Sequence, residues 1–211
     1  MGHIKEMDIQ PDIFETLRAT TILGQAKGSS DFDLSPTLLS QLAPNRVLRP
    51  ASVLIPLIKR NTGVQVILTR RSGNLLHHPG QVAFPGGKVD STDASAKDAA
   101  LREAEEEIGL PRQNVEILGA IGQHETISRF SVIPYLGRVI KDFTPTPESG
   151  EVAEVFEVPL EFLLKPENYQ TQSRVWLGQK GSYLTIPYGP HFIWGATARI
   201  LKGLADRVAL L

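Results

Sequence analysis

The stretch LREAEEEIGL occupies residues 101–110. An α-helix has about 3.6 residues per turn, so positions three and four apart lie on one face. Three glutamates share such a face: Glu103, Glu106 and Glu107. Apolar residues fall on an adjacent face, which we expect to point into the core: Leu101, Ala104 and Ile108. We expect this helix to run from about Ser95 to Ile108 and to end at Gly109.

Three carboxylates on one helix face repel one another, and burial would raise their pKa values. A divalent cation removes both penalties, because Mg²⁺ and Mn²⁺ prefer carboxylate oxygens and share their coordination shell with phosphates. Such an ion polarises phosphoryl oxygens and activates water. The alternative is a solvated acidic face, which is the commoner explanation for a glutamate-rich helix taken alone.

The segment that precedes this helix favours the metal site. It reads Phe84-Pro85-Gly86-Gly87 and follows the strand-like residues QVAF. Paired glycines let backbone N–H and carbonyl groups approach a ligand or a metal closely. An ordinary turn would also account for the glycines. Their position just ahead of an acidic helix, however, indicates a phosphate- and metal-binding strand–loop–helix.

The rest of the chain predicts a single mixed α+β domain. Apolar, β-branched segments predict strands at 51–60, 64–71, 115–121, 130–140 and 152–160. Helices are expected at 11–25, at about 161–169 and at 194–209, with a helical turn at 36–42. The first two strands form a hairpin across residues 61–63, whereas 72–93 is turn-rich and 142–151 is an acidic loop. No linker divides the chain, and the regular rhythm of a doubly wound fold is missing.

Composition sets outer bounds on function. The chain has 211 residues, of which 41% are hydrophobic and 21% charged, as is typical of one globular domain. Its formal net charge of −1 predicts no bulk attraction to nucleic acid or to anionic membranes. We therefore expect neither nucleic acid nor a membrane as a partner, and an anionic substrate would need local groups or a metal to hold it.

The chain contains no cysteine, which excludes disulfides, thiolate metal sites and a cysteine nucleophile. No apolar run reaches the about 18 residues that a membrane span requires. The first ten residues, MGHIKEMDIQ, lack the apolar stretch of a signal peptide. We expect a cytoplasmic protein.

Residues 102–110 resemble the second half of the Nudix box, Arg-Glu-U-x-Glu-Glu-x-Gly-U, where U is a bulky aliphatic residue. Every position agrees except Ala104, which is small for a U position. The match is specific enough that chance is a poor explanation. The chain is thus identified, by resemblance, as a member of the Nudix hydrolase family.

The first half of the box, a glycine and then a glutamate after five further residues, departs from the pattern. The expected glycine position holds Lys88, and the expected glutamate position holds Ala94. Gly87 and Asp93 stand one residue early, as a one-residue insertion before the helix would place them. Asp93 then takes the place of a glutamate that is mainly structural in the family.

The segment LTRRSGNLLHHPGQVAFPGGKVDSTD, residues 68–93, is similar to the signature ahead of the box in the coenzyme A pyrophosphatase branch. The resemblance covers about 48–205, with the box at about 87–110, and leaves 1–47 as an N-terminal helix and loop extension. The branch usually has arginine where this chain has Leu76. A Nudix hydrolase of another nucleoside diphosphate derivative, such as ADP-ribose, is therefore the alternative.

The resemblance implies an α/β/α sandwich with a mixed β-sheet and a Mg²⁺ or Mn²⁺ cofactor. It makes Glu103 and Glu107 the leading metal ligands, while Glu106 either joins them or orients the attacking water. Arg102 and Gly109 would be structural. The implied reaction cleaves the diphosphate of coenzyme A or its derivatives, giving 3′,5′-ADP and 4′-phosphopantetheine or its acylated form. The family also allows for a homodimer.

The remaining roles stay open. The general base is Glu125, in the segment GQHETISRF, or the neighbouring His124. The candidate substrate contacts are Arg70, His78, Gln81, Gly86 and Gly87. Because strand side chains alternate, at most one of Arg70 and Arg71 contacts phosphate. His78 is either structural or a substrate contact.

A third reading belongs to another class of protein: a non-catalytic Nudix module that binds a ligand. The complete set of helix glutamates argues against it, because such a module need not keep a charge cluster that costs stability without metal.

Overall fold

The computed structural model describes residues 12–22, 28–40, 46–176 and 178–211. Both ends of the helix expected at 11–25, from Pro11 to about Gly24, lie outside the described residues. So does Leu42, the end of the helical turn expected at 36–42. No helix within the described ranges is long and apolar enough to cross a membrane.

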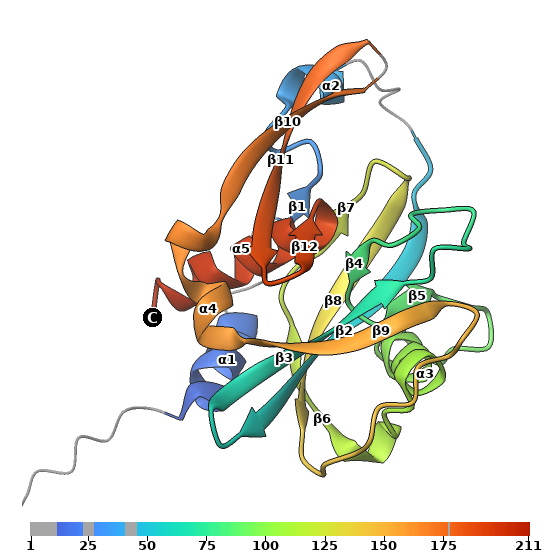
Figure 1. The fold of residues 1–211 in the computed structure, drawn as a ribbon, viewed down its shortest axis with the longest axis vertical. Helices are drawn as coiled ribbons and strands as arrows, with labels where there is room; N and C mark the ends of the chain where they lie inside the picture. Colours follow the sequence, from blue (N-terminus) through green and yellow to red (C-terminus); the bar gives the residue numbers. More distant parts are fainter. Residues whose placement is uncertain (1–11, 23–27, 41–45, 177) are drawn as a thin grey trace, which may run out of the picture.

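A mixed β-sheet of nine strands forms the middle of the molecule (Figure 1). Its strands are β1 (Ser29–Ser30), β2 (Arg49–Arg60), β3 (Gly63–Arg71), β4 (Val82–Ala83), β5 (Gly86–Lys88), β6 (Val115–Ala120), β7 (His124–Glu125), β8 (Phe130–Val139) and β9 (Val152–Pro159). The main path runs β1-β7-β8-β2-β3-β4, while β5 pairs with β2, β6 with β8 and β9 with β3. Strands β2 and β8 are parallel over ten residue pairs, whereas β2 and β3 form the predicted antiparallel hairpin.

Helices cover both faces of this sheet. Helix α3 (Ala96–Ile108) lies on one face, and α1 (Ile13–Ile22), α4 (Leu160–Leu164) and α5 (Ala196–Val208) lie on the other (Figure 1). Leu54 and Ile67 pack with α3, while their neighbours Ile55 and Leu68 pack with the other three helices. Successive strand residues therefore supply two separate cores, as a sheet buried on both faces requires. The expected α/β/α sandwich with a mixed sheet is confirmed.

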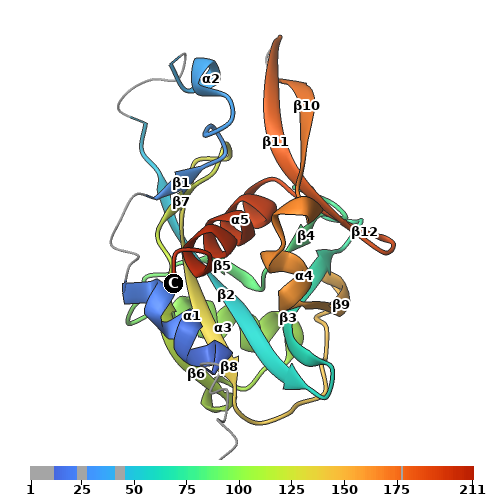
Figure 2. The same ribbon diagram turned by 90° about the vertical axis from the view of Figure 1, so that its left-hand side faces the viewer.

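A second, three-stranded antiparallel sheet follows α4 and was not predicted. It comprises β10 (Gln170–Trp176), β11 (Gln179–Tyr188) and β12 (His191–Trp194), and its β10–β11 ribbon extends away from the main sheet (Figure 2). The last helix, expected near 194–209, is confirmed as α5, with a start slightly later than expected. Trp194 ends β12, Gly195 turns the chain at a φ of 64°, and α5 begins at Ala196.

Short helices complete the fold: α2 (Pro36–Ser40) and the 3₁₀ turns η2 (Arg112–Asn114) and η3 (Pro166–Asn168). Helix α2 confirms the helical turn expected at 36–42. The predicted helix at about 161–169 is shorter than expected and divides into α4 and η3, because Pro166 has no N–H with which to continue α4.

Candidate metal and diphosphate site

Helix α3 has the ends that its sequence predicts. Ser95 caps the start, where its Oγ accepts a hydrogen bond from the N–H of Asp98 at 3.2 Å. Gly109 ends it in the left-handed conformation at a φ of 68°, and its N–H donates to Glu105 at 3.0 Å. Ala100 and Ala104 are fully buried against the sheet. Their small side chains let the helix lie close to β2, so that its glutamates are held beside the preceding loop.

Glu107 is the most deeply buried of the three glutamates, with 5% of its surface exposed. Its Oε2 accepts a hydrogen bond from the N–H of Gly86 at 3.1 Å. Burial, helped by the charges of Glu103 and Glu151, raises the pKa of Glu107 to about 8, although the Gly86 N–H and the charge of Arg71 act in the opposite direction. Without a cation, therefore, this carboxyl resists ionisation near neutral pH.

Glu103 lies against the second glycine of the loop. A Cβ atom on Gly87 would stand 2.4 Å from its Oε1, so no larger residue fits there while Glu103 keeps its place. Gly86 has a φ of 156°, and a Cβ on it would meet the carbonyl oxygen of Ser52 at 2.5 Å. Burial raises the pKa of Glu103, and the neighbouring Arg102 opposes that rise. The structure thus brings together the two glycines and the two glutamates that the sequence singled out.

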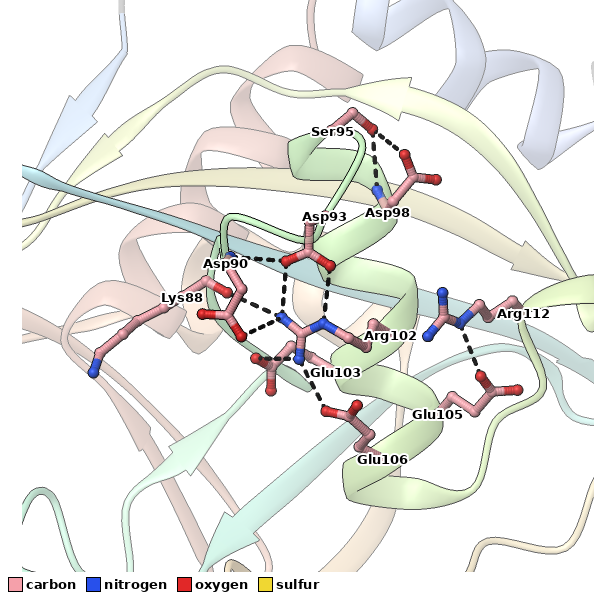
Figure 3. A network of polar contacts seen from close by, with 10 residues as sticks. All are labelled: Lys88, Asp90, Asp93, Ser95, Asp98, Arg102, Glu103, Glu105, Glu106 and Arg112. Atoms are coloured by element: carbon pink, nitrogen blue, oxygen red, sulfur yellow. Dashed lines mark hydrogen bonds and ion pairs between the residues drawn. The ribbon is translucent and has the colours of Figure 1, made fainter.

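Arg102 ties the loop to the helix (Figure 3). Its Nε and Nη2 donate to the two oxygens of Asp93 at 2.9 and 3.0 Å, and Nη2 also donates to the carbonyl of Lys88 at 3.2 Å. Its Nη1 donates to Glu103 at 3.0 Å and to Glu106 at 2.9 Å. The Arg102 guanidinium lowers the pKa of Asp93 to about 2. Asp93 therefore occupies the structural place that the shifted box spacing indicated.

A fourth carboxylate, Glu151, acts electrostatically on this site from a distant part of the sequence. The acidic loop 142–151 lies against the end of α3, where the N–H of Glu148 donates to the carbonyl of Glu107 at 3.0 Å. The carbonyl of Glu151 accepts a hydrogen bond from Ser72 at 2.7 Å. The charge of Glu151 raises the pKa values of both Glu103 and Glu107. Sequence reasoning recorded the acidic loop and missed this residue, although a glutamate just before a predicted strand was a usable signal.

The two candidate bases have partners of their own. Glu125, on β7, forms an ion pair with Arg46. His124 is fully buried, with its ring between the Oγ of Ser29 at 2.8 Å and Oδ1 of Asp31 at 3.1 Å. The structure thus holds both residues in contacts that fix β7 to its surroundings, whereas Glu151 is the carboxylate whose charge reaches the helix glutamates.

The other candidate substrate residues are distributed over two regions. Arg70 forms an ion pair with Glu154 at 3.0 Å on the sheet face opposite α3. Gln81 lies beside Gly195, where α5 begins. His78 is exposed and has a positive φ of 54°. It begins a turn in which the N–H of Gln81 donates a hydrogen bond to the carbonyl of His78 at 3.3 Å. Within the described part of the chain, no hydrogen bond or ion pair joins any of these three residues to the helix glutamates.

The donor set fits a hard divalent cation. Carboxylate oxygens are the ligands that Mg²⁺ and Mn²⁺ prefer, and a buried Glu107 gains from a neighbouring positive charge. Among the described residues, no group of three or more aspartate, glutamate, histidine or cysteine side chains is already arranged to hold a metal ion. Arg102 holds the carboxylates of Glu103 and Glu106 in ion pairs at 3.0 and 2.9 Å.

Comparison with known proteins agrees with this arrangement. The model of the NUDIX domain family matches residues 48–177. The chain is 40% identical to the uncharacterized Nudix hydrolase NudL of Enterobacter sp. (strain 638), over 86% of this chain and 93% of that protein. It is 39% identical to NudL of Escherichia coli (strain K12 / DH10B), over 77% and 84%. The crystal structure of a MutT/nudix family protein from Enterococcus faecalis aligns with a TM-score of 0.51 at 18% identity, over 94% of this chain and 75% of that chain.

The sandwich and its glycine loop ahead of a glutamate helix define a Nudix fold with a Nudix box, and the chain belongs to the Nudix family. It is a Nudix hydrolase, an enzyme that acts on phosphorus anhydrides. Enzymes of this family generally use divalent metal ions such as Mg²⁺. The family, the fold and the enzyme class expected from the sequence are confirmed.

Proposed function

We propose that this enzyme is a Mg²⁺- or Mn²⁺-dependent diphosphatase that cleaves coenzyme A or its derivatives to 3′,5′-ADP and 4′-phosphopantetheine or its acylated form. The observation that carries the chemistry is the contact between Gly86 and Glu107, with Glu103 against Gly87 beside it. The observation that carries the substrate is the segment at 68–93, which resembles the coenzyme A pyrophosphatase signature and leads directly into these glycines.

Each residue has a proposed role. Glu103 and Glu107 hold the cation, and Glu106, whose side chain is 58% exposed, joins them or orients the water. When bound, a divalent cation supplies charge neutralisation of the diphosphate and lowers the pKa of water. Arg102 and Gly109 keep the helix and loop in place. Gly86 and Gly87 bring the loop backbone close against Ser52 and Glu103, and we expect the diphosphate to lie beside this loop.

The base that accepts a proton from the attacking water is a carboxylate outside the helix. Glu125 is the residue proposed from the sequence, and its ion pair with Arg46 competes with that role. Glu151 is the competing assignment from the structure, because its loop lies against the end of α3 and its charge acts on Glu103 and Glu107. Replacing each residue separately by glutamine decides between them.

Leu76 favours a second candidate substrate. It stands where the coenzyme A branch usually has arginine, and it is 95% exposed on the turn-rich segment. A leucine there offers no positive charge to the 3′-phosphate that distinguishes coenzyme A from ADP-ribose. Hydrolysis of ADP-ribose or a related nucleoside diphosphate derivative is therefore the alternative function.

A substrate panel separates the two proposals. Purified enzyme is incubated with coenzyme A, an acyl-coenzyme A, dephospho-coenzyme A or ADP-ribose, each with Mg²⁺ or Mn²⁺, and the products are identified by chromatography and mass. Release of 3′,5′-ADP with the highest kcat/KM for coenzyme A or its thioester supports the main proposal. A higher kcat/KM for ADP-ribose transfers support to the alternative. Turnover of none of the four would favour the non-catalytic binding module.

A further inference from the structure

Arg71, the last residue of β3, carries a buried polar atom without a partner. Among the buried side-chain nitrogen and oxygen atoms of the described residues, the Nε of Arg71 is the one that has no hydrogen-bond partner. A buried donor left unpaired costs free energy, and each such atom in a folded protein calls for an explanation. A ligand that binds beside the atom is one such explanation.

The neighbouring arginine shows what sets Arg71 apart. Arg70 points to the opposite face of the sheet, where Glu154 accepts a hydrogen bond from its Nε at 3.0 Å. Arg71 alternates to the face that packs with α3. Its positive charge lowers the pKa of Glu107, against the larger effect of burial on that carboxyl. One arginine is thus neutralised away from the site, and the other stands beside the glutamates with its Nε unused.

The backbone on both sides of Arg71 is fixed. Its N–H donates to the carbonyl of Gln81 at 3.0 Å, just ahead of the glycine loop. The next residue, Ser72, donates to the carbonyl of Glu151 at 2.7 Å. Opposite Arg71 the pairing of β3 with β9 shifts by one residue, between Glu154 and Val152. Arg71 is therefore held between the loop that bears Gly86 and the loop that bears Glu151.

We propose that Arg71 is the diphosphate-binding arginine of this site and donates from Nε and a terminal nitrogen to a non-bridging phosphoryl oxygen of the substrate. The proposal deepens the function proposed above and rests on it. A guanidinium suits this role because its planar fork of donors matches phosphate and stays charged. It also balances the negative charge that a diphosphate brings close to Glu103, Glu107 and Glu151.

Equilibrium binding tests this role without turnover. The probes are inorganic pyrophosphate and α,β-methylene-ADP, titrated calorimetrically into the full chain with Mg²⁺. The variants are Arg71→Gln and Arg71→Lys, with Arg112→Gln as the control because Arg112 pairs with Glu105 on the exposed side of α3. We expect Arg71→Gln to weaken probe binding by on the order of 10- to 100-fold, the loss of a charged hydrogen bond. Arg71→Lys should restore part of it, and Arg112→Gln should bind as the unmodified protein does.

The affinity for Mg²⁺ alone and the melting temperature are measured for each variant. The proposal requires that folded Arg71 variants keep Mg²⁺ affinity within about threefold while they lose probe affinity. Unchanged probe binding in a folded Arg71→Gln or Arg71→Lys protein overturns it, as does a loss that appears in Arg70→Gln instead. Failure of the coenzyme A proposal is a separate result, because pyrophosphate binding that depends on Arg71 would persist with a different nucleotide substrate.

Discussion

The main-chain N–H of Gly86 donates to Oε2 of Glu107 across 3.1 Å, so the loop ahead of helix α3 is bonded to a carboxylate near the end of that helix. This bond brings the backbone that would receive a diphosphate beside the carboxylates that would hold a cation. Glycine is needed at both loop positions, because a Cβ atom would strike Ser52 at one and Glu103 at the other.

Gly87→Ala should displace Glu103. The new Cβ would lie 2.4 Å from Oε1 of that glutamate, so the carboxylate must move and the cation loses a well-placed ligand. We expect kcat/KM to fall by about tenfold or more, since small displacements in an active site are costly. Gly73→Ala is the control, because nothing lies within 4 Å of a Cβ at Gly73. Equal activity in both variants would contradict the contact.

Glu107 should make stability depend on pH when no metal is present. Its pKa is about 8 in the folded protein against an ordinary glutamate value of 4.5, so the unfolded chain releases this proton first as pH rises. The folded state is therefore favoured below about pH 4.5 and loses that advantage progressively up to about pH 8. The loss is on the order of a few kcal/mol. Urea unfolding in EDTA at pH 5 and pH 9 measures it, and Glu107→Gln should abolish the difference attributed to this group.

Metal binding should depend on pH in the opposite sense. A cation competes with the proton on Glu107, so the apparent Mg²⁺ affinity should rise with pH and level off above about 8. Calorimetric titration in buffers of different ionisation enthalpy reports the released proton. A pH-independent affinity with no proton release would show that Glu107 does not ligate the ion.

Arg102→Lys should destabilise the protein even though lysine keeps the positive charge. Arg102 contacts both oxygens of Asp93 and two further carboxylates through its fork of donors, and an ammonium cannot reproduce that geometry. We expect the melting temperature to fall by several degrees. Arg112→Gln, which breaks the exposed pair with Glu105, should change it little. A fall of the same size in the two variants would refute the anchoring role.

Glu151→Gln and Glu125→Gln should have different effects on kcat. If Glu151 acts beside Glu103 and Glu107, its replacement lowers kcat by on the order of 10- to 100-fold or more. Glu125→Gln should mainly weaken the attachment of β7, through the pair with Arg46, and lower the melting temperature. The reverse pattern, with kcat lost at Glu125 and retained at Glu151, would return the base assignment to β7.

Local signals account for what the sequence predicted well. The ends of α3 follow from Ser95 and Gly109, whose capping roles depend on neighbours within a few residues. The structural place of Asp93 followed from the spacing of the box, and Arg102 confirms it by contact. The two-sided core was expected from the family resemblance, and the largely buried strand β2 supplies side chains to both of its halves.

Long-range contacts account for what the sequence could not predict. Alternation separates Arg70 from Arg71, but which one faces α3 depends on how β3 packs, and Glu154 lies more than eighty residues away from its partner Arg70. Glu151 reaches the site through the backbone of a loop that caps α3. Strand β10 escaped prediction because its residues from Gln170 to Val175 are exposed, so no apolar alternation marks it.

The most direct test of the central claim measures 3′,5′-ADP released from coenzyme A with Mg²⁺ by the unmodified protein, Glu107→Gln and Glu105→Gln. The two variants make the same chemical change on one helix, at a buried residue bonded to Gly86 and at an exposed residue paired with Arg112. We predict that Glu107→Gln loses at least about 100-fold in kcat while Glu105→Gln stays within about twofold. Full activity in Glu107→Gln, or equal losses in the two variants, would contradict the assignment of this helix face as the catalytic metal site.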